Sequence, residues 1–186
     1  MTSRFPDIPE EAMSDEQRRV AAIVASGGRK GVVGPYPMFL RSPQLCEPTA
    51  RLGVFLRFNS AMTPALTELA ILVTARHWRA AFPWTAHAAL ARKAGLADAV
   101  IEATRTGATP PGLSEDERLV HAFCTTLLET RRVPDALFAQ ARARFGEQGV
   151  VDLVGLMGYY GLVSLGVNVA QVPAAQGAED PFPVPA

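Results

Sequence analysis

The feature that most limits how this chain can fold is an unbroken apolar stretch near its C-terminus. Residues 153–170, LVGLMGYYGLVSLGVNVA, carry no charged side chain. This length approaches the roughly 18–20 residues that a helix needs to cross a bilayer. Four glycines and Asn168 dilute the stretch, however, and basic anchors are missing at its ends. We therefore predict a helix that is buried in a core or at a subunit interface, in preference to a membrane span.

Start and stop signals predict that the rest of the chain is helical as well. Ser14-Asp-Glu-Gln17 and Ser114-Glu-Asp-Glu117 have the pattern of capping boxes. Ser42-Pro43 and Thr63-Pro64 each place a capping residue before a proline at the first helical position. No alternating strand pattern is visible, so we expect an all-α protein. The expected helices cover residues 14–25, 42–56, 64–79, 83–95, 97–106, 114–128 and 134–145, followed by the apolar helix, with 64–79 central because it is apolar almost all round.

Length and charge narrow the classes of function. A chain of 186 residues suggests one domain, and its 18 basic and 18 acidic side chains cancel. No basic run stands out, which argues against nucleic acid or an anionic membrane as a partner. The polar, acidic N-terminus does not resemble a secretory signal, so we expect a cytoplasmic protein. We divide the chain into a flexible N-terminus (1–13), one helical domain (14–172) and a flexible Pro-rich tail (173–186).

Glu68 and His87 are the two strongest candidates for chemistry. Glu68 stands in an apolar helix, where a carboxylate needs a partner. It takes part in function, lies on a narrow solvated stripe of the helix, or forms a structural ion pair with an arginine such as Arg57 or Arg79. His87 falls about one turn into its helix, where the helix dipole favours a neutral imidazole that can accept a proton. The alternative is a packed histidine that hydrogen-bonds a carbonyl group.

Three further residues are candidates for substrate binding. Trp84 lies three residues before His87 on the same helix face and could form one wall of a pocket. Arg79 shares a face with Glu68 and could hold a carboxylate, whereas His77 is a weaker candidate because it faces the other way. The sequence contains no HExxH or comparable ligand pair, so we expect no metal and no other cofactor.

Short motifs in a specific order resemble those of the carboxymuconolactone decarboxylase family, which includes the alkylhydroperoxidase D-like proteins. They are Glu68-Leu-Ala-Ile-Leu, Trp84-Thr-Ala-His87 and Ala94-Gly95-Leu96. The likeness extends to Arg41-Ser-Pro-Gln-Leu45 and to the helix after Phe145-Gly146, and it covers about residues 30–172. It implies a compact multi-helix bundle of the alkylhydroperoxidase D-like type, assembled as a homo-oligomer, either a trimer or a hexamer. The excess of apolar surface expected for so short a chain also favours an oligomer.

The resemblance also implies what the chemistry is and is not. The family's redox branch uses a glutamate, a CxxC pair and a histidine, and Glu68 and His87 hold the outer positions here. Ala80 and Pro83 stand where the two cysteines would be, so peroxide reduction through that pair is excluded. Pro83-Trp84 also replaces the Glu-Trp that many non-redox members carry.

The function that the resemblance implies is that of a cofactor-free lyase similar to the lactone decarboxylases. It would act on a small carboxylic acid of the lactone or aromatic-catabolite type, with His87 as acid/base and Glu68 as its orienter or proton reservoir. Isomerisation or hydrolysis would need the same groups. The alternatives are an antioxidant protein that uses Cys46 or Cys124, and a binding or assembly protein on the same fold.

The sequence also raises a geometric difficulty. With the corner between the two helices near Phe82, His87 lies level with about His77. Glu68 is then on the order of 12 Å farther along the helix axis. Under this expectation, Glu68 and His87 can interact only through a kink in a helix, through a chain of water molecules, or with a Glu68 from another subunit.

Overall fold

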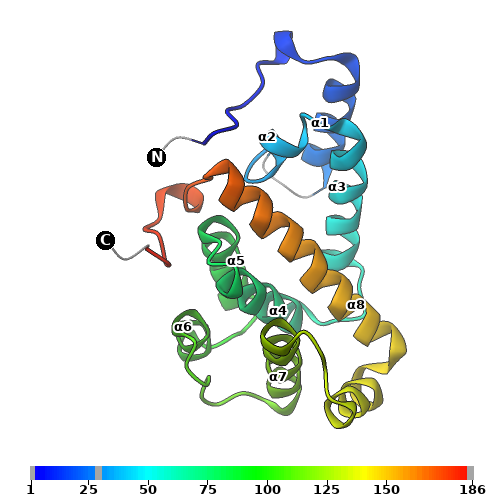
Figure 1. Ribbon diagram of the computed structural model, residues 1–186, viewed down its shortest axis with the longest axis vertical. Helices are drawn as coiled ribbons and strands as arrows, with labels where there is room; N and C mark the ends of the chain where they lie inside the picture. Colours follow the sequence, from blue (N-terminus) through cyan, green and yellow to red (C-terminus); the bar gives the residue numbers. More distant parts are fainter. Residues whose placement is uncertain (1–2, 28–30, 184–186) are drawn as a thin grey trace.

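The computed structural model describes residues 3–27 and 31–183, and this part of the chain contains helices and no strands. The predicted all-α class is therefore confirmed. Eight α-helices and two short 3-10 helices follow one another (Figure 1). In chain order they are η1 (Glu10–Ala12), α1 (Asp15–Ser26), α2 (Tyr36–Phe39), α3 (Pro43–Phe58), α4 (Pro64–His77), α5 (Ala81–Lys93), α6 (Asp98–Thr106), α7 (Glu115–Thr130), α8 (Asp135–Ala170) and η2 (Ala175–Gly177).

Most helices begin at the residues that the capping signals indicate. Ser14 and Ser114 each form a complete capping box, with Gln17 and Glu117 as the reciprocal partners. The Thr63 side chain accepts a hydrogen bond from the Leu66 amide at the start of α4. These local contacts satisfy amides that the helix leaves unpaired at its first turn.

The start of α5 differs from the sequence-based prediction. Helix α5 begins at Ala81 rather than at Pro83, because a proline is tolerated anywhere in the first turn, where its missing N–H costs no helical hydrogen bond. The corner between α4 and α5 therefore lies at Trp78–Ala80. Arg79 turns the chain there, with a positive φ of 49°. This shift of the corner decides how the candidate site is assembled.

Helix α8 joins two segments that the sequence predicts as separate helices. They meet at Gly146, whose φ of 71° and ψ of 176° interrupt the helical backbone without a loop. Glycine adopts this conformation without the steric penalty that other residues incur. The apolar half of α8 after Gly146 then runs diagonally across the molecule (Figure 1). By length and composition alone, α8 could cross a membrane. However, 61% of its most apolar 18-residue segment is buried inside the protein, and core helices can be equally long and apolar.

Helix α4 is central, as the sequence predicts. Every residue from Leu66 to Ala75 is buried. The helix packs against α5, α6, α7 and α8, and these elements share one hydrophobic core. Because α4 is enclosed on all sides, any polar side chain on it has to find its partner inside the protein.

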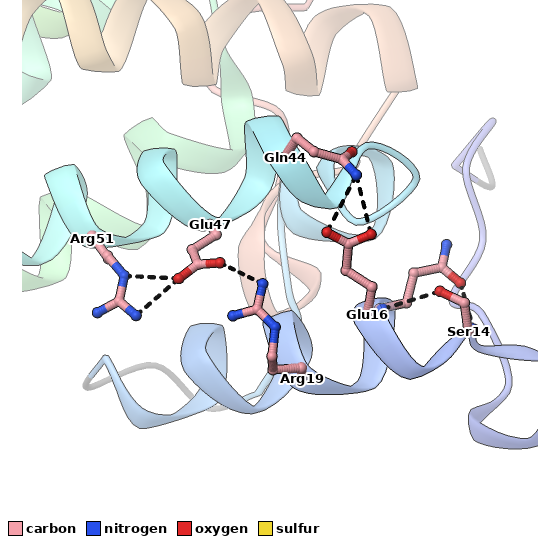
Figure 2. Close-up of polar contacts among 7 residues, drawn as sticks. Ser14, Glu16, Arg19, Gln44, Glu47 and Arg51 are labelled. Carbon is pink, nitrogen blue, oxygen red and sulfur yellow. Dashed lines mark hydrogen bonds and ion pairs between the residues drawn. The ribbon is translucent and has the colours of Figure 1, made fainter.

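A second, smaller core lies between α1, α2 and α3, formed by residues that include Val20, Val24, Phe39 and Leu40. Figure 2 shows the polar contacts beside it. Glu47 pairs with Arg19 at 2.7 Å and with Arg51 at 2.9 Å, and Gln44 donates to Glu16. Ion pairs at the surface contribute little to stability, because water and salt screen them. The apolar contacts therefore hold α1 against α3 more than the ion pairs do.

Both terminal segments, which the sequence predicts to be flexible, contact the helical domain where they are described. The Arg4 amide donates to the Ala170 carbonyl at 2.7 Å. Arg79 donates to the carbonyl oxygens of Phe182 and Pro183 at 3.1 and 2.9 Å, and the ring of Phe182 packs edge-on against Trp84. The tail therefore covers the start of α5. Residues 1–2 and 184–186 of the two predicted flexible ends lie outside the described residues.

Candidate functional site

A row of three buried, hydrogen-bonded side chains joins α4, α5 and α8. Glu68 Oε2 lies 2.6 Å from His87 Nδ1, and Tyr160 Oη lies 2.9 Å from His87 Nε2. The exposed fractions of Glu68, His87 and Tyr160 are 8%, 7% and 3%. Both imidazole nitrogens are therefore engaged, one by a carboxylate and the other by a phenol. This arrangement fixes the ring and connects a proton donor to a proton acceptor.

Glu68 and His87 meet within one chain, which corrects the sequence-based expectation of a gap on the order of 12 Å. With the turn centred on Arg79, His87 lies eight residues after it and is level with Ile71, eight residues before it. Glu68 is then only three residues farther along α4, which corresponds to about 4.5 Å. Two side chains of this length span that offset, so the contact needs no kink, water chain or second subunit.

The protonation of Tyr160 indicates how the row is arranged. Burial raises the pKa of the Tyr160 phenol well above its usual range, and Tyr159 and Glu68 raise it further, while Arg57 acts in the opposite direction. Tyr160 therefore keeps its proton at neutral pH, and its O–H group can donate a hydrogen bond to His87 Nε2. With Tyr160 as the donor, the N–H group of His87 is on Nδ1 and donates a hydrogen bond to the Glu68 carboxylate. In this state the imidazole accepts from Tyr160 and is oriented by Glu68.

The row opens into a cavity of about 620 Å³ between α5 and α8. All three tyrosines of the chain line this cavity, together with His87, and the Tyr36 and Tyr159 hydroxyl groups lie 3.0 Å apart. Its volume is in the range of small-molecule sites, which are mostly apolar with a few convergent polar groups. The other lining residues are mainly apolar: Val33, Pro35, Phe82, Pro83, Ala86, Ala89, Leu90, Val163 and Ala175. Phe82 and Pro83 thus form part of an apolar wall. They stand where the family that the sequence resembles has its reactive residues.

The other predicted site residues lie elsewhere. Trp84 is 3% exposed and packs into the core against Phe182 rather than lining the cavity. Arg79 binds carbonyl groups of the tail. His77 packs against Trp78 and, with Arg79, lines a separate hollow of about 380 Å³. Burial and neighbouring arginines lower the pKa of His77. The structure therefore brings Glu68 and His87 together, while none of the three proposed binding residues lines the cavity.

Sequence reasoning missed Tyr160 and assigned Arg57 a different role. A buried hydroxyl group inside an otherwise apolar helix needs a hydrogen-bond partner. The two adjacent tyrosines at 159–160 could therefore have indicated a polar contact at this position. Arg57 entered the sequence analysis as an ion-pair partner of Glu68. In the structure the carboxylate of Glu68 binds His87, and Arg57 lines the cavity instead.

The two cysteines are placed where thiol chemistry is unfavourable. Cys46 belongs to the small core and Cys124 to the main one, and each is 0% exposed. Burial raises the pKa of the Cys124 thiol far above its ordinary value. Because the thiolate is the reactive form, such a cysteine is a poor nucleophile.

Across residues 3–27 and 31–183, no group of three or more His, Cys, Asp or Glu side chains is arranged to hold a metal ion. No protein-family model matches the chain, and no curated protein matches it in sequence. The candidate site therefore rests on its own geometry: a buried carboxylate, imidazole and phenol in line, with the last two facing an apolar cavity.

Proposed function

We propose that this protein is a cofactor-free enzyme that performs acid/base chemistry on a small carboxylic acid of the lactone or aromatic-catabolite type, in the cavity between α5 and α8. The observation that carries the proposal is the row Glu68–His87–Tyr160, which ends at this cavity. The reaction class is that of a lyase resembling the carboxymuconolactone decarboxylases. The motifs around Glu68 and His87 support this class, together with the all-helical architecture.

Decarboxylation would use the row as a proton relay. The bond between the substrate carbon and its carboxylate breaks, CO₂ leaves, and the electron pair moves into an adjacent lactone or enone carbonyl. The Tyr160 hydroxyl then protonates the carbon, while His87, protonated beforehand by solvent, returns a proton from Nε2 to the phenolate oxygen. Glu68 stabilises the charged imidazole during this step. The substrate has then lost CO₂ and gained one proton, which solvent supplied.

The surroundings of the relay suit such a reaction. A carboxylate beside Phe82, Pro83 and Val163 has poor solvation, and its charge becomes delocalised as CO₂ departs, so an apolar wall favours the transition state over the ground state. In the resting arrangement His87 accepts a proton instead of giving one. The same three residues would then serve an isomerisation or a hydrolysis, which begins with proton removal.

The alternative of an alkylhydroperoxidase-like antioxidant protein is disfavoured by the cysteines. Its chemistry needs an accessible thiolate with a second thiol near it. Cys46 and Cys124 are fully buried and lie in different cores. The alternative of a non-catalytic binding or assembly protein would use the same cavity without proton transfer, and the experiment below separates it from an enzyme.

We also propose that the bundle is of the alkylhydroperoxidase D-like type and assembles as a homo-oligomer, a trimer or a hexamer. The apolar half of α8 carries an exposed stripe of Val151, Val154, Leu162, Leu165 and Val169, with exposed fractions from 36% to 68%. These positions recur every three or four residues or multiples of them, so they share one helix face. Gly158 on the same face has open space around it, which would allow a second helix to approach closely. A second copy of the stripe is a suitable partner because the stripe bears no charge that an unlike partner would have to neutralise.

A substrate screen with matched histidine variants tests the enzymatic proposal. Small lactones and unsaturated or aromatic carboxylic acids are incubated with the wild-type protein, with His87→Gln and with His121→Gln, while CO₂ release and changes in ultraviolet absorbance are followed. General acid/base assistance is worth about 10²–10⁴ in rate, so His87→Gln should lose activity by that factor. His121, on α7 and away from the cavity, provides the control. Turnover that His87→Gln leaves intact would refute the proposal, and tight binding without turnover would favour the binding protein.

A further inference from the structure

Arg57 is a cation at the cavity whose charge has no counter-ion in the described part of the chain. It lies near the end of α3 and lines the cavity beside His87 and Tyr160. Its Nε atom is buried and has no hydrogen-bond partner; within the described residues only one other buried side-chain polar atom, Ser164 Oγ, shares this condition. A buried donor without a partner costs free energy, and the cost is greater for a charged group. An unpaired buried donor in a native protein calls for an explanation, and a ligand that accepts its hydrogen bond is one.

The neighbouring arginine on the same helix shows what Arg57 lacks. Arg51 donates two hydrogen bonds to Glu47 and faces solvent, and Figure 2 shows this pair together with Arg19. Among the described residues, no carboxylate does the same for Arg57. The described residues that line the cavity include Arg57 and Lys93 but neither Asp nor Glu. The carboxylate of Glu68 is engaged with His87 behind the cavity wall. The cavity therefore presents an excess of positive charge to a ligand.

The guanidinium of Arg57 is also held in place. It stacks over the ring of Phe58 with 4.7 Å between its Cζ atom and the ring centroid. This contact limits the freedom of the side chain before a ligand binds. The positive charge of Arg57 also acts on Tyr160. It lowers the pKa of the phenol, whereas burial raises it. An anion bound to Arg57 would thus lie close to the phenol that transfers the proton.

We propose that Arg57 is the specificity-determining residue of the cavity and binds a carboxylate of the substrate that the reaction leaves intact. That the bound molecule is a substrate rests on the proposed function. The binding test of Arg57 does not depend on it. A guanidinium pairs with a carboxylate through two charge-assisted hydrogen bonds. The pairing stabilises the negative charge, which opposes loss of CO₂ from that same group. The carboxylate at Arg57 is therefore an anchor, and the bond that reacts is a different one of the same substrate, within reach of Tyr160.

Equilibrium binding of simple probes tests the anchor without any turnover. Benzoate and phenylacetate, and the uncharged benzamide and phenylacetamide, are titrated by calorimetry into the wild-type protein and into Arg57→Met, Arg57→Lys and Arg51→Met. We expect the carboxylates to bind the wild type at least tenfold more tightly than the amides, since hydrogen bonds to charged groups are the stronger ones. Arg57→Met should abolish this preference and Arg57→Lys should keep part of it. Arg51→Met, which removes an arginine already paired to Glu47, should retain the full preference.

The outcomes separate this inference from the proposed function. Equal binding of carboxylate and amide by the wild type, no binding of either, or a preference that survives in Arg57→Met would overturn the anchor, even if the protein proved to be an enzyme. A preference that depends on Arg57 supports the anchor even if no turnover is found. Thermal melts of Arg57→Met and Arg57→Lys establish that both variants are folded. For any substrate identified, a product without a carboxylate would overturn the statement that the anchored group is retained.

Discussion

Tyr160 places its hydroxyl 2.9 Å from His87 Nε2, whereas the adjacent Tyr159 directs its own to Tyr36, at 3.0 Å. Successive residues of a helix point about 100° apart. Both tyrosines line the same cavity. Their hydroxyl groups point in different directions and therefore have different hydrogen-bond partners. Only the Tyr160 hydroxyl is connected to Glu68, through the imidazole. The two tyrosines thus form a matched pair for separating proton transfer from the general polarity of the cavity.

The first prediction uses this pair. Tyr160→Phe removes the proton donor that we propose and should lower kcat by about 10²–10⁴ on any substrate found by the screen. Tyr159→Phe removes a hydroxyl that does not touch His87 and should change KM more than kcat. Steady-state kinetics on both variants check this expectation. Equal losses of kcat in the two variants would show that Tyr160 has no special connection to His87.

Much of the fold could be predicted because its signals are local. Capping boxes at Ser14 and Ser114 and the Thr63-Pro64 pair marked helix starts correctly. Pro83 did not, because a proline fits several positions of the first turn and so leaves the start uncertain by a few residues. That small shift changed the offset between Glu68 and His87 along the helix axis from roughly 12 Å to about 4.5 Å. A site between two helices therefore depends strongly on the corner that joins them.

The site could be predicted only in part, for a different reason. A carboxylate and an imidazole in apolar helices stand out, so Glu68 and His87 were found. The direction of the Tyr160 hydroxyl depends on how α8 crosses α5, which no spacing within α8 reveals. Trp84 looked like a pocket wall because it lies three residues before His87, yet its ring is covered by Phe182, almost a hundred residues later in the chain.

The second prediction concerns stability. His87→Ala leaves the Glu68 carboxylate buried without a partner, and this should lower the free energy of unfolding by about 3–5 kcal/mol. Glu68→Gln keeps an acceptor for the His87 Nδ1–H group and should cost less, about 1–3 kcal/mol. Urea unfolding of both variants and of the double variant measures their coupling. His121→Ala, which breaks no carboxylate–imidazole contact, is the control. Additive losses in the double variant would mean that the two residues do not stabilise one another.

The third prediction concerns alkaline pH. The pKa of Tyr160 is raised in the folded protein above its unfolded value of about 10. The folded state therefore binds this proton more strongly than the unfolded state does. The resulting stability is fully present below about pH 10 and is lost as the pH rises from there through the higher folded-state pKa. The free energy of unfolding should thus fall less steeply above pH 10 in Tyr160→Phe than in the wild type or in Tyr159→Phe. Denaturant titrations at several pH values provide the measurement, with tyrosinate absorbance followed in parallel. If the free energy of unfolding changed with pH equally in all three proteins, Tyr160 would not be buried as described.

The fourth prediction tests whether copies of the protein assemble through α8. Leu165 and Val154 are 47% and 46% exposed on the uncharged stripe, and a Glu at either position would be desolvated in an interface between two copies. Leu165→Glu and Val154→Glu should therefore reduce the trimer or hexamer that we propose for the wild type to smaller species. Phe138→Glu is the matched control, since Phe138 is 43% exposed on the same helix but lies before the break at Gly146. Sedimentation equilibrium at micromolar concentration gives the masses. A monomeric wild type would refute the assembly altogether, while an oligomer that resists both stripe variants but dissociates in Phe138→Glu would move the interface to the first half of α8.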